Sequence, residues 1–298
     1  MQDHPIHGKP GPLGRVLFST HPVNISFHRI GLESGSALLN LPAGTQVRPF
    51  APAGVPASYI SGHGDAKGRK ILYLHGGGYM VGSRRTHKSL ASYLCKIAGA
   101  ECVLPDYRRA PEHPFPAALE DVYAVYLAML DQGIDPQCIA LAGDSAGGGL
   151  TAALLLALKA MGKPLPSCAY LMSPWVNLAD NDLHFKAPFT KRTDIADWFC
   201  HFMSHMYVGQ CDPAHPFVSP VFGDFQGLPP LFVTVGKYEP LCRQAEELAE
   251  RAQMAGVDVT FKPYRSYVHV LQALAPFSKR IHGLLAKGGD FIHEHCPA

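Results

Sequence analysis

The sequence predicts an α/β fold, in which a mostly parallel, doubly wound sheet carries helices on both faces and a helical cap. From Lys70 onward, short apolar runs alternate with longer segments of helical pattern, and the connections between them are short. Several of these short runs are apolar at nearly every position, as strands buried on both faces are. With 298 residues, 47% of them hydrophobic, the chain is long enough to bury the core of such a sheet.

The first part of the chain has a different character. Residues 1–43 are rich in Gly and Pro and show no clear period, which indicates an N-terminal cap segment. Residues 44–298 are predicted to form the main domain. At its start, the alternation across residues 45–50 predicts an edge strand, residues 58–60 its antiparallel neighbour, and residues 62–65 the turn into the next strand.

The βα units follow from residue 70. The predicted strands cover residues 70–74, 101–104, 138–142, 168–172, 231–235 and 257–263. The predicted helices cover residues 87–98, 116–130, 146–161 and 241–255, with a last helix from about Leu271. Because parallel strands end at the same edge of a sheet, the loops that follow them are expected to meet there.

The alternation breaks at residues 177–229, where no strand is convincing. Within this insertion, residues 194–207 carry apolar side chains at helical spacing, namely Ile195, Trp198, Phe199, Phe202, Met203 and Met206. The insertion is therefore predicted to form a second cap segment. Two interpretations of its apolar stripe stay open: simple packing on the sheet domain, or the wall of a substrate pocket.

One serine lies where a strand turns sharply into a helix. Gly143-Asp144-Ser145-Ala146-Gly147 joins the apolar run 138–142 to the Ala- and Leu-rich run that follows. A serine flanked by glycines two positions away, in this context, is typical of a nucleophile elbow, which lifts the hydroxyl above the sheet edge. Ser145 is therefore the predicted nucleophile. The alternative is a chance match in a glycine-rich chain, and two further features argue against it.

The first feature is a glycine loop, His75-Gly76-Gly77-Gly78-Tyr79, directly after the strand 70–74. Consecutive glycines let the main chain approach a substrate, so the N–H groups of Gly76, Gly77 and Ala146 are predicted to form an oxyanion hole. A phosphate-binding loop is the alternative. It is disfavoured because neither Gly-Lys-Ser/Thr nor Gly-x-Gly-x-x-Gly with an acidic partner is present.

The second feature is His269, which lies late in the chain just after a strand-like run. Hydrolases with a nucleophile elbow need the chain order serine, acid, histidine, and His269 is placed as the base. Glu239 is the only carboxylate in the loop after the strand 231–235, so it is the predicted acid. An exposed acid at a helix N-terminus is the alternative for Glu239. Asp144 and Asp106 are interpreted as structural carboxylates near the elbow.

Together with the segment from Asp106 to Ala118 and with Ser173-Pro174-Trp175, these motifs resemble the hormone-sensitive lipase-like group of α/β-hydrolases. The match runs from about Lys70 to His269. It departs from the family's pattern at Arg109, where leucine is usual, and at Arg243-Gln244, where an acidic pair is usual. Because that pair is replaced, no neighbouring carboxylate competes with Glu239.

The resemblance implies a carboxylesterase that acts on short to medium acyl chains without a metal or organic cofactor. In the predicted mechanism His269 deprotonates Ser145, Glu239 holds the imidazole, and water resolves an acyl-enzyme. Tyr79, Trp198 and Phe202 are predicted to contact the substrate. Lactone opening, or deacetylation of a xenobiotic, antibiotic or sugar ester, stays open. A binding-only role, as in the related gibberellin receptor of plants, is disfavoured because that receptor lacks the catalytic histidine.

The composition limits the classes of molecule that the protein is expected to bind. The formal charge is +2 and Lys and Arg are scattered, which argues against nucleic acid and anionic membranes and favours small neutral substrates. The N-terminus has no signal-peptide pattern and no run of eighteen apolar residues occurs, so a soluble, cytoplasmic protein is expected, as a monomer or homodimer. The eight cysteines are irregularly spaced and are predicted to be reduced. The tail His293-Glu294-His295-Cys296 is predicted to be a frayed end rather than a metal site.

Overall fold

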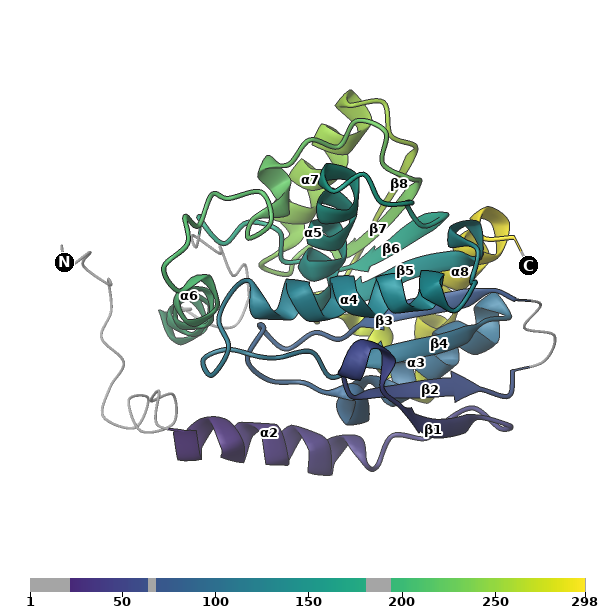
Figure 1. Ribbon diagram of the computed structural model, residues 1–298. Coiled ribbons are helices and arrows are strands. Elements are labelled where there is room, and N and C mark those ends of the chain that lie inside the picture. Colours follow the sequence, from purple (N-terminus) through teal and green to yellow (C-terminus); the bar gives the residue numbers. More distant parts are fainter. Residues whose placement is uncertain (1–21, 64–67, 181–193, 298) are drawn as a thin grey trace.

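The computed structural model describes residues 22–63, 68–180 and 194–297, and these residues form one sheet covered by helices (Figure 1). The strands are β1 (Gln46–Phe50), β2 (Ala57–Ser61), β3 (Lys70–Leu74), β4 (Glu101–Pro105), β5 (Ile139–Asp144), β6 (Cys168–Met172), β7 (Leu231–Gly236) and β8 (Val259–Tyr264). Their order across the sheet is β1-β2-β4-β3-β5-β6-β7-β8. β2 is antiparallel to both its neighbours, and every other neighbouring pair is parallel. The predicted mostly parallel sheet is confirmed.

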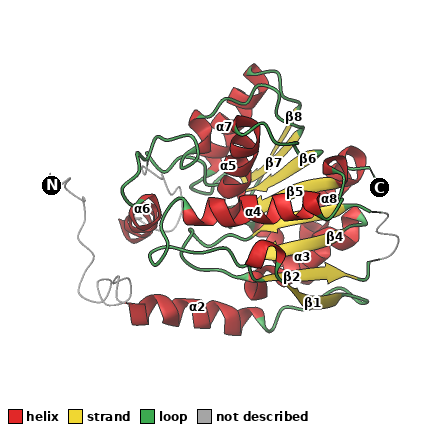
Figure 2. Cartoon of the chain, viewed as in Figure 1, coloured by secondary structure: helices red, strands yellow, loops and turns green. Residues whose placement is uncertain are grey.

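Helices pack on both faces of the sheet. They are α2 (Pro22–Ser36), α3 (Arg84–Ala98), α4 (Ala117–Asp131), α5 (Ala146–Ala160), α6 (Asp194–Val208), α7 (Cys242–Met254) and α8 (Lys279–His295), with short 3-10 helices η1 (Pro52–Gly54), η2 (Pro136–Cys138), η3 (Pro220–Phe222) and η4 (Leu271–Phe277). α4, α5 and α7 cover one face, and α3 and α8 cover the other (Figures 1 and 2).

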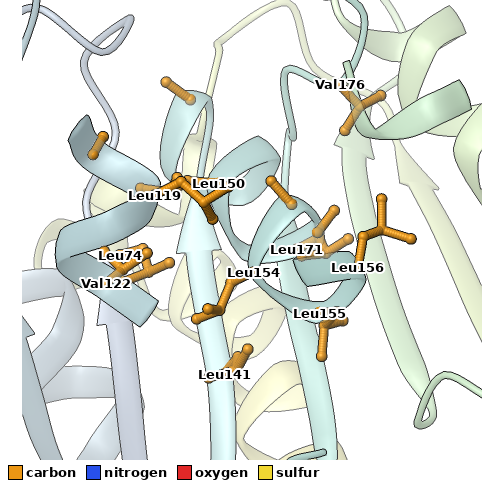
Figure 3. Close-up of a cluster of buried hydrophobic side chains, with 14 of the residues drawn as sticks. Leu74, Leu119, Val122, Leu141, Leu150, Leu154, Leu155, Leu156, Leu171 and Val176 are labelled. Carbon is orange, nitrogen blue, oxygen red and sulfur yellow. The ribbon is translucent and has the colours of Figure 1, made fainter. Parts of the chain in front are cut away.

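The side chains of the central strands alternate between two apolar cores. In β3, Leu72 and Leu74 join the core under α4 and α5, whereas Ile71 and Tyr73 join the core under α3 and α8, and all four are fully buried. Figure 3 shows the first core, in which leucines of α5 and side chains of α4 pack over the strands. Because both faces are covered, the strands read as continuous apolar runs in the sequence.

Local hydrogen bonds explain where the structure differs from the predicted element ends. α3 begins at Arg84, three residues earlier than predicted, because the Ser83 hydroxyl accepts from the backbone of the first turn and the Thr86 hydroxyl accepts from Ser83 N–H. The predicted last helix from Leu271 is instead the 3-10 helix η4 followed by α8, whose N-terminus Ser278 caps. Cys138, predicted in a strand, lies in η2.

The prediction of a frayed tail is wrong. α8 continues to His295, and Cys296 is fully buried in the core that α3 and α8 cover. The buried Arg69 explains this order, because its guanidinium donates to the carbonyls of Cys296 at 2.5 Å and of Ala98 at 2.9 Å. One side chain thus ties the C-terminal ends of α8 and α3 together. All eight cysteines lie in the described ranges, and none of them is joined to another by a disulfide bond.

Two helices lie outside the covering layers, α2 and α6 (Figure 2). In the described part of the chain no strand occurs between β6 and β7, where the second cap insertion was predicted. Residues 1–21 of the predicted N-terminal cap and residues 181–193 of the insertion lie outside the described residues, as do two residues of the turn predicted at 62–65. The division into two cap segments and a catalytic domain stays a prediction. No helix in the described ranges is long and apolar enough to span a membrane.

Candidate active site

Ser145 occupies a strained position between β5 and α5. Its backbone has φ 53° and ψ −123°, a conformation that non-glycine residues rarely adopt. The turn fits only because its neighbours are small: a Cβ at Gly147 would lie 2.0 Å from the carbonyl oxygen of Leu74. Ser145 N–H donates to Met172 O at 2.9 Å, which fixes the turn to β6. The geometry is that of a nucleophile elbow.

Loops after three different strands bring Ser145, His269 and Glu239 together. Ser145 Oγ lies 2.8 Å from His269 Nε2, and His269 Nδ1 lies 3.2 Å from Glu239 Oε2. The His269 side chain is 41% exposed, whereas that of Glu239 is fully buried. The His269 imidazole is therefore open to solvent, and the Glu239 carboxylate is shielded from it.

Backbone hydrogen bonds join the Glu239 loop to the His269 loop. Tyr238 N–H donates to Ser266 O at 3.1 Å, and Lys237 N–H donates to Tyr264 O at 2.8 Å. The buried Gln272, three residues after His269, donates to the Thr234 hydroxyl at 2.9 Å and accepts from the Tyr264 hydroxyl at 2.9 Å. These bonds fix the loop that carries Glu239 to the loop that carries His269.

The structure also accounts for the departure at Arg243-Gln244. The Gln244 side-chain oxygen accepts from the backbone N–H of Asn177 at 3.1 Å, and its amide donates to Asp180 O at 3.3 Å. A carboxylate could not make the second bond, because it has no hydrogen to donate. Gln244 therefore ties the segment after Trp175 to α7 and leaves Glu239 as the carboxylate at His269.

The predicted oxyanion donors need one correction. Gly76 N–H does not face the pocket; it donates to the Asp144 carboxylate at 3.2 Å. Gly77 and Gly78 line the pocket beside Ser145 instead, and both have positive φ. In the described residues the N–H groups of Gly77, Gly78 and Ala146 donate to no other group. The available donors are therefore one residue further along the loop than predicted.

An apolar cavity of about 430 Å³ opens over Ser145 and His269. Its further lining residues are Leu32, Gly77, Gly78, Val81, Gly82, Thr86, His87, Asp144, Trp175, Cys200, Met203, Pro240, Leu241, Tyr267 and Val270. The cavity falls within the usual range for small-molecule sites. α2 contributes to its wall through Leu32, and α6 through Cys200 and Met203.

Two of the three predicted substrate contacts, Tyr79 and Phe202, are not among the described residues that line this cavity. Tyr79 is 1% exposed and stacks on Tyr207, with ring centroids 3.7 Å apart, so it supports the pocket wall from within the core. Phe202 packs against the main core instead of facing the cavity. The side chain of Trp198 lies outside the described residues. On the same helix, Cys200 and Met203 line the cavity. Of these two residues only Met203 belongs to the predicted stripe, so the pocket-wall interpretation holds for Met203.

Comparison with known proteins agrees with this geometry. The family described as having the alpha/beta hydrolase fold matches residues 71–273. The chain is 44% identical over 227 residues to an acetyl-hydrolase of Streptomyces hygroscopicus, covering 76% of this chain and 75% of that protein. It is 36% identical over 255 residues to the putative acetyl-hydrolase LipR of Mycobacterium tuberculosis, covering 86% and 82%. The crystal structure of an esterase from the bacterial hormone-sensitive lipase family is similar to it with a TM-score of 0.87, 36% identity and 96% coverage of both chains.

The chain belongs to the hormone-sensitive lipase-like α/β-hydrolases.

In this α/β-hydrolase a buried polar network supports the glycine loop from behind. Besides Gly76 N–H, the Asp144 carboxylate accepts from the Tyr73 hydroxyl at 2.7 Å and lies 3.3 Å from His87 Nε2. Burial alone would raise the pKa of Asp144, but His87 and the Tyr73 hydrogen bond outweigh it and lower the pKa. Burial likewise lowers the pKa of His87, and the Asp144 carboxylate outweighs it, so the pKa is raised. The prediction that Asp144 is structural agrees with these contacts.

A second histidine of this hydrolase stays neutral. His75 is fully buried and stacks on Tyr107, with ring centroids 4.2 Å apart. Burial, followed by the nearby His87, lowers the pKa of His75 to about 3. A neutral imidazole behind the glycine loop leaves His87 as the positive partner of Asp144.

Sequence reasoning missed most of the cavity wall. Leu32, Trp175 and Tyr267 come from three separate segments, and no sequence motif places them in one cavity. A signal existed for two of them. Trp175 ends the Ser-Pro-Trp motif, and Tyr267 lies two residues before the base.

Proposed function

We propose that this α/β-hydrolase is a serine carboxylesterase that cleaves esters of short acyl groups through an acyl-enzyme. The proposal rests on one observation: Ser145, His269 and Glu239 are joined by hydrogen bonds, and Ser145 and His269 line an apolar cavity. The names of its relatives support the reaction class, since they include acetyl-hydrolases, an esterase and carboxylesterases.

In the first step His269 Nε2 takes the proton of the Ser145 hydroxyl as Oγ attacks the ester carbonyl carbon. The carbonyl oxygen becomes an oxyanion, which the N–H groups of Gly77, Gly78 and Ala146 stabilise. Glu239 accepts from His269 Nδ1–H, so it holds the tautomer in which Nε2 is basic and stabilises the imidazolium that forms.

The imidazolium then gives its proton to the alcohol oxygen, and the bond between that oxygen and the carbonyl carbon breaks. The alcohol leaves and the acyl group stays on Ser145. In the second half a water molecule attacks the acyl carbon while His269 takes its proton. Collapse of this second intermediate releases the carboxylic acid and returns the proton to Ser145 Oγ. The 41% exposure of His269 gives water access to the base.

The cavity supports a small acyl group. A volume of about 430 Å³ has to hold both the acyl and the alcohol parts of the ester, so a long chain would leave part of its length unburied. The two acetyl-hydrolase relatives favour acetyl esters among the possible substrates, and removal of an acetyl group from a larger alcohol uses the same chemistry.

Purified wild type and Ser145→Ala test the proposal on p-nitrophenyl acetate, butyrate and palmitate. We expect wild-type kcat/KM to be highest for the two short esters, and Ser145→Ala to lose about a millionfold in kcat, the size of effect seen when a serine protease loses its nucleophile. Ser34→Ala, at an exposed serine of α2, is the matched control and should keep full activity. Wild-type turnover by Ser145→Ala would contradict the proposal.

A further inference from the structure

We propose that Tyr267, supported by Tyr238, forms a subsite for an aromatic group on the alcohol side of the ester. The proposal rests on the carboxylesterase function above and names a substrate class for it, namely acyl esters of aryl-bearing alcohols. Both tyrosines are close in sequence to the proposed catalytic residues but are not among them. Tyr267 precedes His269 by two residues, and Tyr238 directly precedes Glu239.

The chemistry fixes the side on which the alcohol group lies. His269 Nε2 has to reach the leaving oxygen to protonate it, so the alcohol group lies on the His269 side of the scissile carbon. The cavity wall on that side comes from the loops of the base and the acid, through Tyr267, Val270, Pro240 and Leu241. The acyl group points away from His269, toward the wall built by Met203 and the glycine loop.

The Tyr267 ring is held in place and yet open. It stacks on Tyr238 with ring centroids 4.6 Å apart and an interplanar angle of 23°. Its loop is fixed on both sides, because Val268 N–H donates to the Ser266 hydroxyl at 2.9 Å and Ser266 O accepts from Tyr238 N–H. Even so, Tyr267 is 50% exposed while it lines the cavity. An immobilised aromatic surface that adjoins the reacting atoms loses little conformational freedom when a ligand packs on it.

An aromatic ligand fits this surface better than an aliphatic one of equal size. Ring pairs gain attraction from offset or edge-to-face contact beyond the area they bury. The neighbouring wall residues Pro240, Leu241 and Val270 are apolar, so the subsite offers no charged partner to a polar alcohol group. The exposed half of Tyr267 can therefore be covered by the ring of a bound ester.

Two acetate esters separate aromaticity from size. Benzyl acetate and cyclohexylmethyl acetate have rings of equal carbon number on the same one-carbon link, and both give the same acetyl-enzyme. Each variant is compared with wild type on the same ester, so the intrinsic reactivity of the ester cancels. The variants are Tyr267→Leu, Tyr267→Phe and Tyr238→Leu, with Phe277→Leu as the control, because Phe277 is an aromatic residue with 63% exposure outside the cavity lining.

We expect Tyr267→Leu to lower kcat/KM for benzyl acetate by about 3- to 10-fold, the range that one aromatic contact supplies, and for cyclohexylmethyl acetate by less than about twofold. Tyr267→Phe keeps the ring and should match wild type. Tyr238→Leu removes the support and should give a smaller loss, again selective for benzyl acetate. The control Phe277→Leu should change neither ester.

Two results would overturn the subsite. An equal loss on both esters in Tyr267→Leu would show a general defect of the His269 loop, and unchanged kcat/KM for benzyl acetate would show that the ring does not contact the alcohol group. Failure of the esterase function itself looks different. In that case wild type hydrolyses neither ester, or hydrolyses them equally well after Ser145→Ala.

Discussion

Among the single residues, Glu239 gives the strictest test of the proposed mechanism, because its carboxylate is buried. Its side chain is fully buried, one oxygen lies 3.2 Å from His269 Nδ1, and the other has no hydrogen-bond partner in the described part of the chain. A carboxylate with so few partners is costly to bury, which is consistent with a role in orienting and charging His269 rather than in stability. The alternative of an exposed acid at a helix N-terminus does not fit this burial.

Substitution of Glu239 separates charge from shape. Glu239→Gln keeps the shape, removes the charge that stabilises the imidazolium and allows the wrong histidine tautomer, so we expect kcat to fall by about a hundredfold or more. The corresponding change of aspartate to asparagine in a serine protease costs about ten-thousandfold. Glu239→Asp keeps the charge and should retain more activity. Steady-state kinetics on p-nitrophenyl butyrate measure both variants. Near-normal kcat in both would place the catalytic acid elsewhere.

The sequence predicts the three residues of the proposed triad better than it predicts the oxyanion donors. Chain order and the elbow motif suffice to select Ser145, Glu239 and His269 as neighbours, because parallel strands deliver their loops to one edge. The oxyanion donors depend on which way each peptide of the glycine loop points. Asp144 captures Gly76 N–H, a long-range contact that no local pattern contains.

At the scale of elements, α2 is joined to the rest of the molecule mainly by polar contacts. The Arg29 guanidinium makes two 2.8 Å bonds to the Glu112 carboxylate, and also donates to Met80 O at 2.8 Å and Ala110 O at 3.0 Å. Among the α2 side chains that the structure describes, only Ile25 and Ser36 are buried. The helix nevertheless supplies Leu32 to the cavity wall, so its attachment bears on the pocket.

Removal of the Arg29 contacts should loosen α2. We expect Arg29→Met to speed amide hydrogen exchange of residues 25–36 by about tenfold or more while leaving α5 protected, because a bidentate Arg–carboxylate pair and two backbone contacts are lost. Exchange followed by mass spectrometry measures both helices. Arg280→Met, at an exposed arginine of α8, is the control. Unchanged exchange in α2 would show that the polar contacts do not hold the helix.

Elements were predictable where periodicity was strong. The strands 70–74 and 168–172 match at both ends, since runs buried on both faces have sharp boundaries. α2 was not recognised because its sequence has no apolar stripe. The residues at helical spacing that could form one, Ile25, Arg29, Glu33 and Ser36, are mostly polar. The tail was misjudged for a related reason: Arg69 lies more than two hundred residues from the carbonyl of Cys296 that it binds.

For the molecule as a whole, the His87–Asp144 pair couples stability to pH. The pKa of His87 is raised from 6.5, so its contribution is complete below that value and is lost as pH rises through the raised pKa. The pKa of Asp144 is lowered from 3.8, so its contribution is present above 3.8 and is lost as pH falls through the lowered pKa. The pair therefore stabilises the fold most at mildly acid pH.

His87→Gln tests this coupling, since it keeps a donor near Asp144 and removes the charge. We expect the free energy of unfolding to fall by about 1 to 3 kcal/mol at pH 6, with a smaller loss at pH 9, because the contribution of charged His87 is lost as pH rises through its raised pKa. Urea unfolding at the two pH values measures the difference, and the exposed His113→Gln is the control. An equal loss at both pH values would mean that only shape, and not charge, is involved.

The fold of the whole molecule could be predicted while the shape of the pocket could not. Alternating apolar runs determine the layers, because each run has to be buried on both sides. The cavity, by contrast, is assembled from α2, α6, the glycine loop and the loops after β7 and β8. The cavity volume depends on how these segments, which are far apart in the sequence, pack against one another. Local sequence patterns do not predict that packing.

The most direct test of the central claim is to identify the residue that forms the acyl-enzyme. A fluorophosphonate mimics the attacked ester and stays on the nucleophile, so intact mass and peptide sequencing locate the adduct. We predict one adduct per chain, on Ser145, with labelling slowed strongly in His269→Ala and absent in Ser145→Ala. Labelling of another residue, or stoichiometric labelling of Ser145→Ala, would contradict the assignment of Ser145 as the nucleophile.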